Sequence, residues 1–76
     1  MIELDTVETI PMALGGDGVI RIGGTRVTLD TLVAAFREGA TPEEIAQQYP
    51  SVALGDIYEV IGYALPHPET IEAYLT

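Results

Sequence analysis

The sequence predicts a small α+β fold, mostly helical, in which an N-terminal β-hairpin leads into a helix–turn–helix core and a short C-terminal helix. Three observations predict it. Glycine-rich turns separate short β-branched runs before residue 28, apolar residues recur at helical spacing after it, and residues 39–46 can end one helix and begin the next. The chain of 76 residues has room for one domain, with a hairpin region at 10–28 and a helical core at 29–76. Residues 1–9 are expected to fray or to form a short edge strand.

The hairpin region alternates short apolar runs with glycine turns. Residues 10–14 alternate weakly, as in a strand, and residues 15–18 form a glycine-rich turn. A phosphate-binding loop would need a helix directly after this turn, whereas the Val-Ile-Arg-Ile run at 19–22 is typical of a strand. A second tight turn at 23–25 leads to another short run at 26–28, so these last two runs also resemble a hairpin of two short strands.

The first helix is expected to begin after Thr28, whose hydroxyl suits an N-cap. Its apolar residues recur at helical spacing and predict one buried stripe, made of Leu29, Leu32, Val33 and Phe36. Gly39 follows this stripe and can take the left-handed conformation that ends a helix. Thr41 and Glu44 have the spacing of a capping box, and Pro42 between them suits the first position of a second helix.

Three more helices are expected after this corner, which lies at residues 39–46. The second helix runs from Pro42 to Tyr49 and stops at Pro50. The third runs from Leu54 to Leu65, with Val60 at the margin of a buried stripe made of Leu54, Ile57, Tyr58, Ile61, Ala64 and Leu65. The last helix begins at Pro68, and its residues available for packing are Ile71, Tyr74 and Leu75.

The start of the third helix is weakly encoded. Ala53 occupies the position where a capping hydroxyl would be useful, and Gly55 lies in the first turn. Ser51 is a candidate substitute cap, and Asp56 compensates in part through the helix dipole. A late start of this helix is therefore one expectation.

Charge is the most informative bulk property. The net charge is −9, and the chain has no lysine and three arginines. Residues 1–40 contain six acids and all three arginines, whereas residues 41–76 contain six acids and no Lys or Arg. Nucleic-acid affinity comes largely from neutralising phosphates with Lys and Arg, so DNA binding by this chain alone is disfavoured. An acidic surface suits a basic protein partner instead.

Catalysis and cofactor binding have little support in the sequence. There is no Cys and one His, His67, which lies between two prolines. Without a nucleophile–base arrangement or a set of metal ligands, we expect a protein that is not an enzyme and that binds no metal or cofactor. No apolar run reaches the length of a membrane span and no signal peptide is evident, so a cytoplasmic location is expected.

Residues for partner binding come from the acidic half. As a recognition helix, the third helix would expose mostly acids and glycines to DNA, namely Gly55, Asp56, Glu59, Gly62 and Tyr63. We therefore predict a protein contact through Glu43, Glu44, Asp56, Glu59 and Tyr63, because Tyr63 is hard to place inward and Tyr is enriched at interfaces. Tyr49 and Tyr58 are expected to complete the core. Arg21 and Arg26 are candidate contacts to DNA or to a partner, for example from a two-chain β-ribbon.

Several motifs in order resemble the domain-of-unknown-function family 433. They are Ile20-Arg21 with Gly24-Thr25-Arg26-Val27, the corner from Gly39 to Ile45, Tyr49-Pro50, Leu54-Gly55-Asp56-Ile57 and Tyr63-Ala64. The resemblance covers roughly residues 15–76. It implies a homeodomain-like three-helix fold after a hairpin, no established enzymatic activity, and an antitoxin-like role beside PIN-like ribonucleases. Ala53 departs from the Ser or Thr of the family pattern, and the unusual acidity of the third helix puts DNA binding in doubt.

Three functional hypotheses remain open at this point. The first is an antitoxin-like partner of a PIN-like ribonuclease, whose acidic surface, with Glu69 and Glu72 added to the residues above, would cover a basic RNA-binding face. The second is a dimeric helix–turn–helix transcriptional regulator that reads DNA through its hairpin arginines. The third is a structural homo-oligomer. A homodimer formed through the hairpin is expected, since two strands alone are marginally stable.

Overall fold

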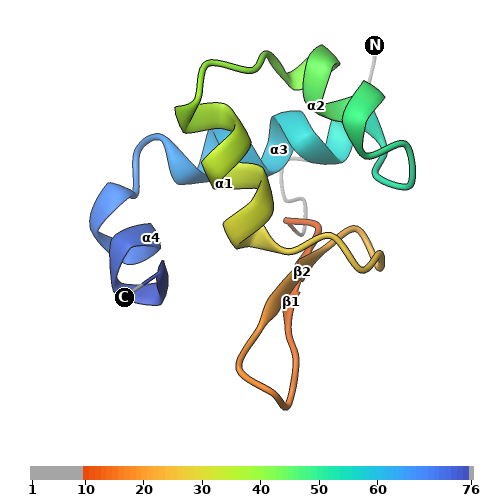
Figure 1. Ribbon diagram of the computed structural model, residues 1–76. Coiled ribbons are helices and arrows are strands. Elements are labelled where there is room, and N and C mark those ends of the chain that lie inside the picture. The colour runs from red at the N-terminus through yellow and green to blue at the C-terminus, as the bar shows by residue number, and fades with distance from the viewer. Residues whose placement is uncertain (1–9, 76) are drawn as a thin grey trace, which may run out of the picture.

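The structure is a computed structural model that describes residues 10–75 (Figure 1). The fraying or edge strand predicted for residues 1–9 lies outside the described residues. The predicted α+β fold, an N-terminal antiparallel hairpin followed by mostly helical structure, is confirmed. In chain order, the two strands and four helices are β1 (Met12–Leu14), β2 (Ile20–Ile22), α1 (Leu29–Arg37), α2 (Pro42–Gln48), α3 (Leu54–Ala64) and α4 (Pro68–Leu75).

The hairpin is formed by β1 and β2, and it projects away from the helices (Figure 1). Its register pairs Met12 with Ile22 and Leu14 with Ile20, and the intervening turn is closed by the Gly15 N–H, which donates to the Val19 carbonyl at 2.9 Å. The second hairpin that the sequence predicts is reduced to one isolated bridge between Arg21 and Thr28. The chain cannot continue as a strand beyond this bridge, because Thr28 is the N-cap of α1 and the helix begins at Leu29.

The corner between α1 and α2 has the predicted left-handed glycine and the predicted capping box. Gly39 has a φ of +100°, and the N–H groups of Gly39 and Ala40 donate to the carbonyls of Phe36 and Ala35, which is a Schellman closure. Thr41 and Glu44 form the capping box, with reciprocal bonds of 3.0 and 3.1 Å, and Pro42 occupies the first position of α2. Both helix ends at this corner are therefore satisfied by local residues.

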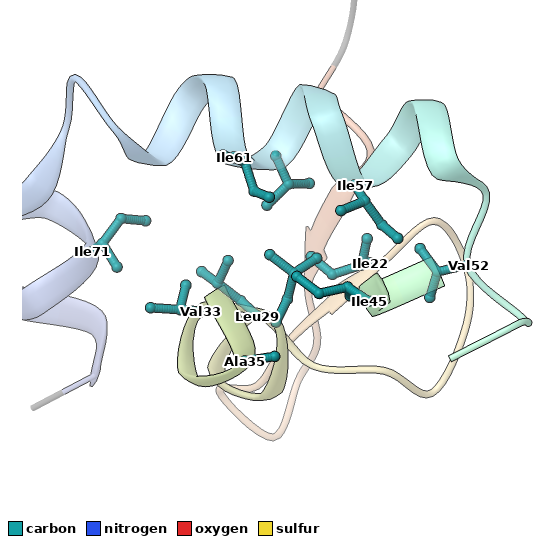
Figure 2. Close-up of a cluster of buried hydrophobic side chains, with 11 residues drawn as sticks. Ile22, Leu29, Val33, Ala35, Ile45, Val52, Ile57, Ile61 and Ile71 are labelled. Carbon is teal, nitrogen blue, oxygen red and sulfur yellow. The ribbon is translucent and has the colours of Figure 1, made fainter. Parts of the chain in front are cut away.

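The core lies where α1, α2 and α3 meet the inner side of β2. Figure 2 shows Ile57 and Ile61 extending from one side of α3 toward this cluster. The buried residues are all apolar and comprise Ile22, Leu29, Leu32, Val33, Ala35, Ile45, Val52, Ile57, Val60, Ile61 and Ile71. At about 25 cal/mol per Å² of apolar surface, this burial is the main stabilising term for so small a chain.

The predicted buried stripe of α3 is wrong at its edges. Val60, expected at the margin, is completely buried, whereas Leu54, Tyr58 and Leu65 are largely exposed. Helix α3 contacts β2 and α4 as well as α2, so several elements together decide which of its sides is buried. α3 starts at Leu54 and not later, although Ala53 makes no capping hydrogen bond with its side chain.

The last helix, α4, is held by three separate contacts. Ile71 is buried in the core cluster, and Arg37 of α1 donates to the carboxylate of Glu72. The hydroxyl of Tyr74 accepts a hydrogen bond from the Ile20 N–H of β2 at 2.8 Å. The prediction that Ile71 and Tyr74 pack inward is confirmed, and α4 is thereby tied to both the helices and the hairpin.

Candidate protein-interaction surface

The acidic residues predicted for partner binding are used in different ways by the fold. Glu43 and Glu44 are both exposed in the first turn of α2, where acids are favoured by the helix dipole. The Glu44 carboxylate accepts the N–H of Thr41 in the capping box, and this backbone bond, with the Thr41 side chain, lowers the pKa of Glu44. Glu43 instead accepts a hydrogen bond from the hydroxyl of Tyr58 on α3.

The contact between Glu43 and Tyr58 connects α2 with the exposed side of α3. It lowers the pKa of Glu43 and raises the pKa of Tyr58, because the hydrogen bond favours the charged carboxylate and the neutral phenol. Tyr58 is 49% exposed, so the expectation that it completes the core is wrong. Helical spacing alone puts Tyr58 beside the buried stripe. The direction of its hydroxyl is decided by Glu43 of α2, which accepts its hydrogen bond.

Asp56 and Glu59 do not join Glu43 in one patch. At about 100° per residue, Asp56 lies about 160° around α3 from Tyr58, and it faces the turn after β2. There a Cβ atom on Gly23 would approach its carboxylate to 2.7 Å, and the φ of Gly23 is +58°. Asp56 is half-buried, whereas Glu59 is exposed between these two sides of the helix.

Tyr63 is less exposed than the sequence indicates. It is half-buried against the core, and its ring stacks on the ring of His67 with centroids 4.4 Å apart. His67 Nδ1 also donates to the Tyr63 carbonyl at 2.8 Å. The exposure of Tyr63 is reduced because the turn before α4 brings His67 over its ring. The exposed tyrosine of α3 is Tyr58.

Most of the positive charge is already paired. Arg21 donates to both carboxylate oxygens of Asp17 in the hairpin turn, and this contact lowers the pKa of Asp17 to about 2 and raises that of Arg21. Arg37 is paired with Glu72. Arg26 is exposed and makes no ion pair with any residue of 10–75. Of the two arginines predicted to contact DNA or a partner, Arg21 therefore has its charge offset within the hairpin.

An apolar cavity of about 220 Å³ opens between α1, α3 and α4. Phe36, Ile61, Leu65 and Pro68 are among its lining residues. Within residues 10–75, no three His, Cys, Asp or Glu side chains gather as a metal site requires. In the same part of the chain, no helix is long and apolar enough to cross a membrane.

Comparison with known proteins identifies one family. A sequence model described as "Protein of unknown function (DUF433)" matches residues 7–64 of this chain. The match includes the hairpin, the α1–α2 corner and α3, and it ends before α4. No curated protein matches, and no solved structure matches.

Proposed function

The chain belongs to the DUF433 family, and from this premise we propose that it is a non-catalytic, antitoxin-like partner of a PIN-like ribonuclease. The single observation that carries the proposal is the sign of its surface. From residue 41 to residue 75 the chain contains six Asp and Glu residues and no Lys or Arg. The exposed acids in this range are Glu43, Glu44, Glu59, Glu69 and Glu72.

The electrostatics favour a basic protein over a nucleic acid. A nuclease surface that binds RNA phosphates presents Lys and Arg, and complementary charge accelerates association and orients the partners. Two of the three arginines of this chain are paired with its own acids, so they contribute little net attraction for phosphates. The resemblance to presumed antitoxins supplies the class of partner, and the cytoplasmic location predicted from the sequence suits it.

The test is to co-express the chain with the product of the neighbouring gene and to measure ribonuclease activity against increasing amounts of the purified chain. We expect the two proteins to co-purify at a fixed ratio and the activity to fall to background. The association should weaken at high salt, because the contact is between opposite charges. A nuclease that keeps full activity with the chain in excess would refute the proposal.

A second candidate is a dimeric helix–turn–helix regulator that binds DNA. The observations in its favour are the exposed Arg26 after β2 and the exposed Leu14 on β1, which would suit a contact between two hairpins. A mobility-shift assay with the chain's own promoter, at low and at high salt, separates the two candidates. Absence of a shift at low salt would exclude this one, because phosphate contacts are strongest there.

A further inference from the structure

An exposed flank of α3, directly beside its buried side, carries an unusual set of residues, and at its C-terminal end this flank borders the apolar cavity that Leu65 lines. Three large apolar side chains are exposed there, with Leu54 at 41%, Tyr58 at 49% and Leu65 at 62%. At about 100° per residue they fall within about 40° of arc, so they form one stripe along the helix. Gly55 and Gly62 continue the same side of the helix. We call this set, Leu54, Gly55, Tyr58, Gly62 and Leu65, the outer face of α3.

Neither glycine of the outer face is required by the fold of this chain. Both lie inside the helix and neither has a positive φ, unlike Gly23 or Gly39. A Cβ atom at either position would meet nothing within 4 Å. Each glycine costs a helix about 1 kcal/mol relative to alanine. What the two glycines do provide is a shallow notch beside the apolar stripe, where the backbone of another molecule can approach closely.

The charges beside the outer face select the kind of molecule that can cover it, and an arginine near it, Arg37 beside the cavity that Leu65 lines, is already paired with Glu72. Glu43 is hydrogen-bonded to Tyr58, and Glu59 is exposed on the next side of α3. No Lys or Arg occurs from residue 41 onward. A second copy of this chain would bring the same acidic surface to a symmetric contact, so the acids of the two copies would repel one another. A partner that carries Lys or Arg beside an apolar stripe would complement both the exposed apolar side chains and the acids next to them.

We propose that the outer face of α3 is a docking surface for an amphipathic helix of a partner protein, whose apolar stripe is flanked by Lys and Arg. This inference rests on the proposed function, since it assigns the surface through which the basic partner binds. The partner helix packs its stripe along Leu54, Tyr58 and Leu65 and approaches most closely at Gly62. Its basic residues lie near Glu43 and Glu59. This is the helix-in-groove mode of recognition, with an α-helical stripe opposite an apolar strip.

The direct test uses a synthetic helical peptide of about five turns, with leucine and alanine on one side and lysine on the other. A matched peptide keeps the apolar side and replaces every lysine with glutamate. Each is titrated into the ¹⁵N-labelled full chain at low and at high salt. We expect the basic peptide to shift amide resonances of α3, chiefly around Tyr58 and Gly62, and to bind more weakly at high salt. The acidic peptide should leave the spectrum unchanged.

Two matched variants locate the surface. Gly62→Arg fills the notch and adds a positive charge at the outer face, and it should weaken binding of the basic peptide at least about tenfold. Ala34→Arg makes the same addition at an exposed position of α1 and should leave the affinity within about twofold. Gly62→Arg replaces a poor helix former with a good one, so circular dichroism should show a folded protein.

Several outcomes would overturn the proposal. They are equal binding of the acidic and basic peptides, resonance shifts confined to other elements, no binding by the basic peptide, or unchanged affinity in Gly62→Arg. A concentration-dependent dimer that Gly62→Arg abolishes would show that a second copy covers this face, contrary to the proposal.

The nuclease assay keeps this inference separate from the proposed function. If wild type and Gly62→Arg inhibit the nuclease equally, the function stands and the docking surface lies elsewhere. If wild type does not inhibit while the basic peptide still binds at α3, the docking surface stands and the choice of partner is wrong.

Discussion

The α1–α2 corner and α3 differ in how far the fold itself accounts for their residues. At the corner, Gly39 has a positive φ, Thr41 and Glu44 complete a capping box, and Pro42 occupies a position where its missing N–H costs nothing. On α3, Ala53 provides no side-chain cap, and the helix carries Gly55 and Gly62 and three exposed apolar residues besides.

This difference separates residues required for folding from residues available for binding. The hydrogen bonds that close the corner, those of Gly39, Ala40, Thr41 and Glu44, all join groups within a few residues of one another, so these residues are accounted for by the fold. The inner side of α3 is equally constrained, since Ile57 and Val60 are completely buried. On its outer face, Gly55 and Gly62 make no close contact that requires a glycine, and both weaken the helix. Substitutions on the two sides of α3 should therefore have opposite effects on stability.

The largest expected effect comes from the inner side of α3. Ile57→Ala removes a completely buried side chain and should lower the free energy of unfolding by about 2–5 kcal/mol. Urea denaturation followed by circular dichroism measures this. If the variant does not fold, Ile57→Val should still show a loss of about 1 kcal/mol. A loss well below these values would mean that α3 is not packed as described.

Gly39 at the corner and Gly62 on the outer face of α3 allow the same substitution to be compared in the two regions. Gly39→Ala places a side chain at a φ of +100° and should cost about 1–2 kcal/mol. Gly62→Ala adds a methyl group in open space on a helix and should raise stability by about 0.5–1 kcal/mol. Both variants are compared with wild type by thermal unfolding. Shifts in Tm of the same sign would remove the distinction between the corner and the outer face.

The two helix starts should respond in opposite directions. Thr41→Ala removes the hydroxyl that accepts the Glu44 N–H and should destabilise the chain by about 1 kcal/mol. Ala53→Ser supplies a hydroxyl where α3 has none, and the backbone there is already extended, so a gain of up to about 1 kcal/mol is expected. Chemical denaturation of both variants measures the pair. Destabilisation by Ala53→Ser would show that the missing cap is not a weakness.

The smallest effect on stability concerns the hairpin turn. Arg21 and the Val19 N–H lower the pKa of Asp17 from 3.8 to about 2. A lowered carboxyl pKa means that the contact contributes stability above pH 3.8 and that this contribution is lost as the pH falls toward about 2. The contribution is small because both side chains are largely exposed to solvent. NMR titration should give the low midpoint, and Arg21→Gln should return it toward 3.8. An unchanged midpoint in Arg21→Gln would rule out this cause.

Sequence reasoning succeeded where the determining interactions are local. The left-handed Gly39, the capping box of Thr41 and Glu44, and the cap of Thr28 each depend on groups no more than five residues apart. Their chemistry is therefore readable from the residue types and spacing alone. The acidic character of the surface is likewise a property of composition. The sequence does not show which of these acids lie near one another. Asp56, for example, is only two residues from Tyr58, yet the two side chains lie on different sides of α3.

The predictions failed where a distant element decides the outcome. Periodicity identified the helix of α3 but not the limits of its buried side, because these limits depend on its contacts with β2 and on the hydrogen bond between Tyr58 and Glu43 of α2. The close approach of Asp56 to Gly23 joins parts of the chain more than thirty residues apart. The second predicted hairpin is reduced to one bridge because α1 begins at Leu29, directly after the bridge residue Thr28.

The hydrogen bond from the Ile20 N–H to the Tyr74 hydroxyl makes one amide proton a reporter for the whole of α4. When α4 swings away, this proton loses its acceptor and the apolar walls between α1 and α3 become wet at the same moment. Protection of the Ile20 amide against deuterium exchange should then report the population of the state in which α4 is open. The mobility of a helix outside the family match can thus be followed from a single strand residue.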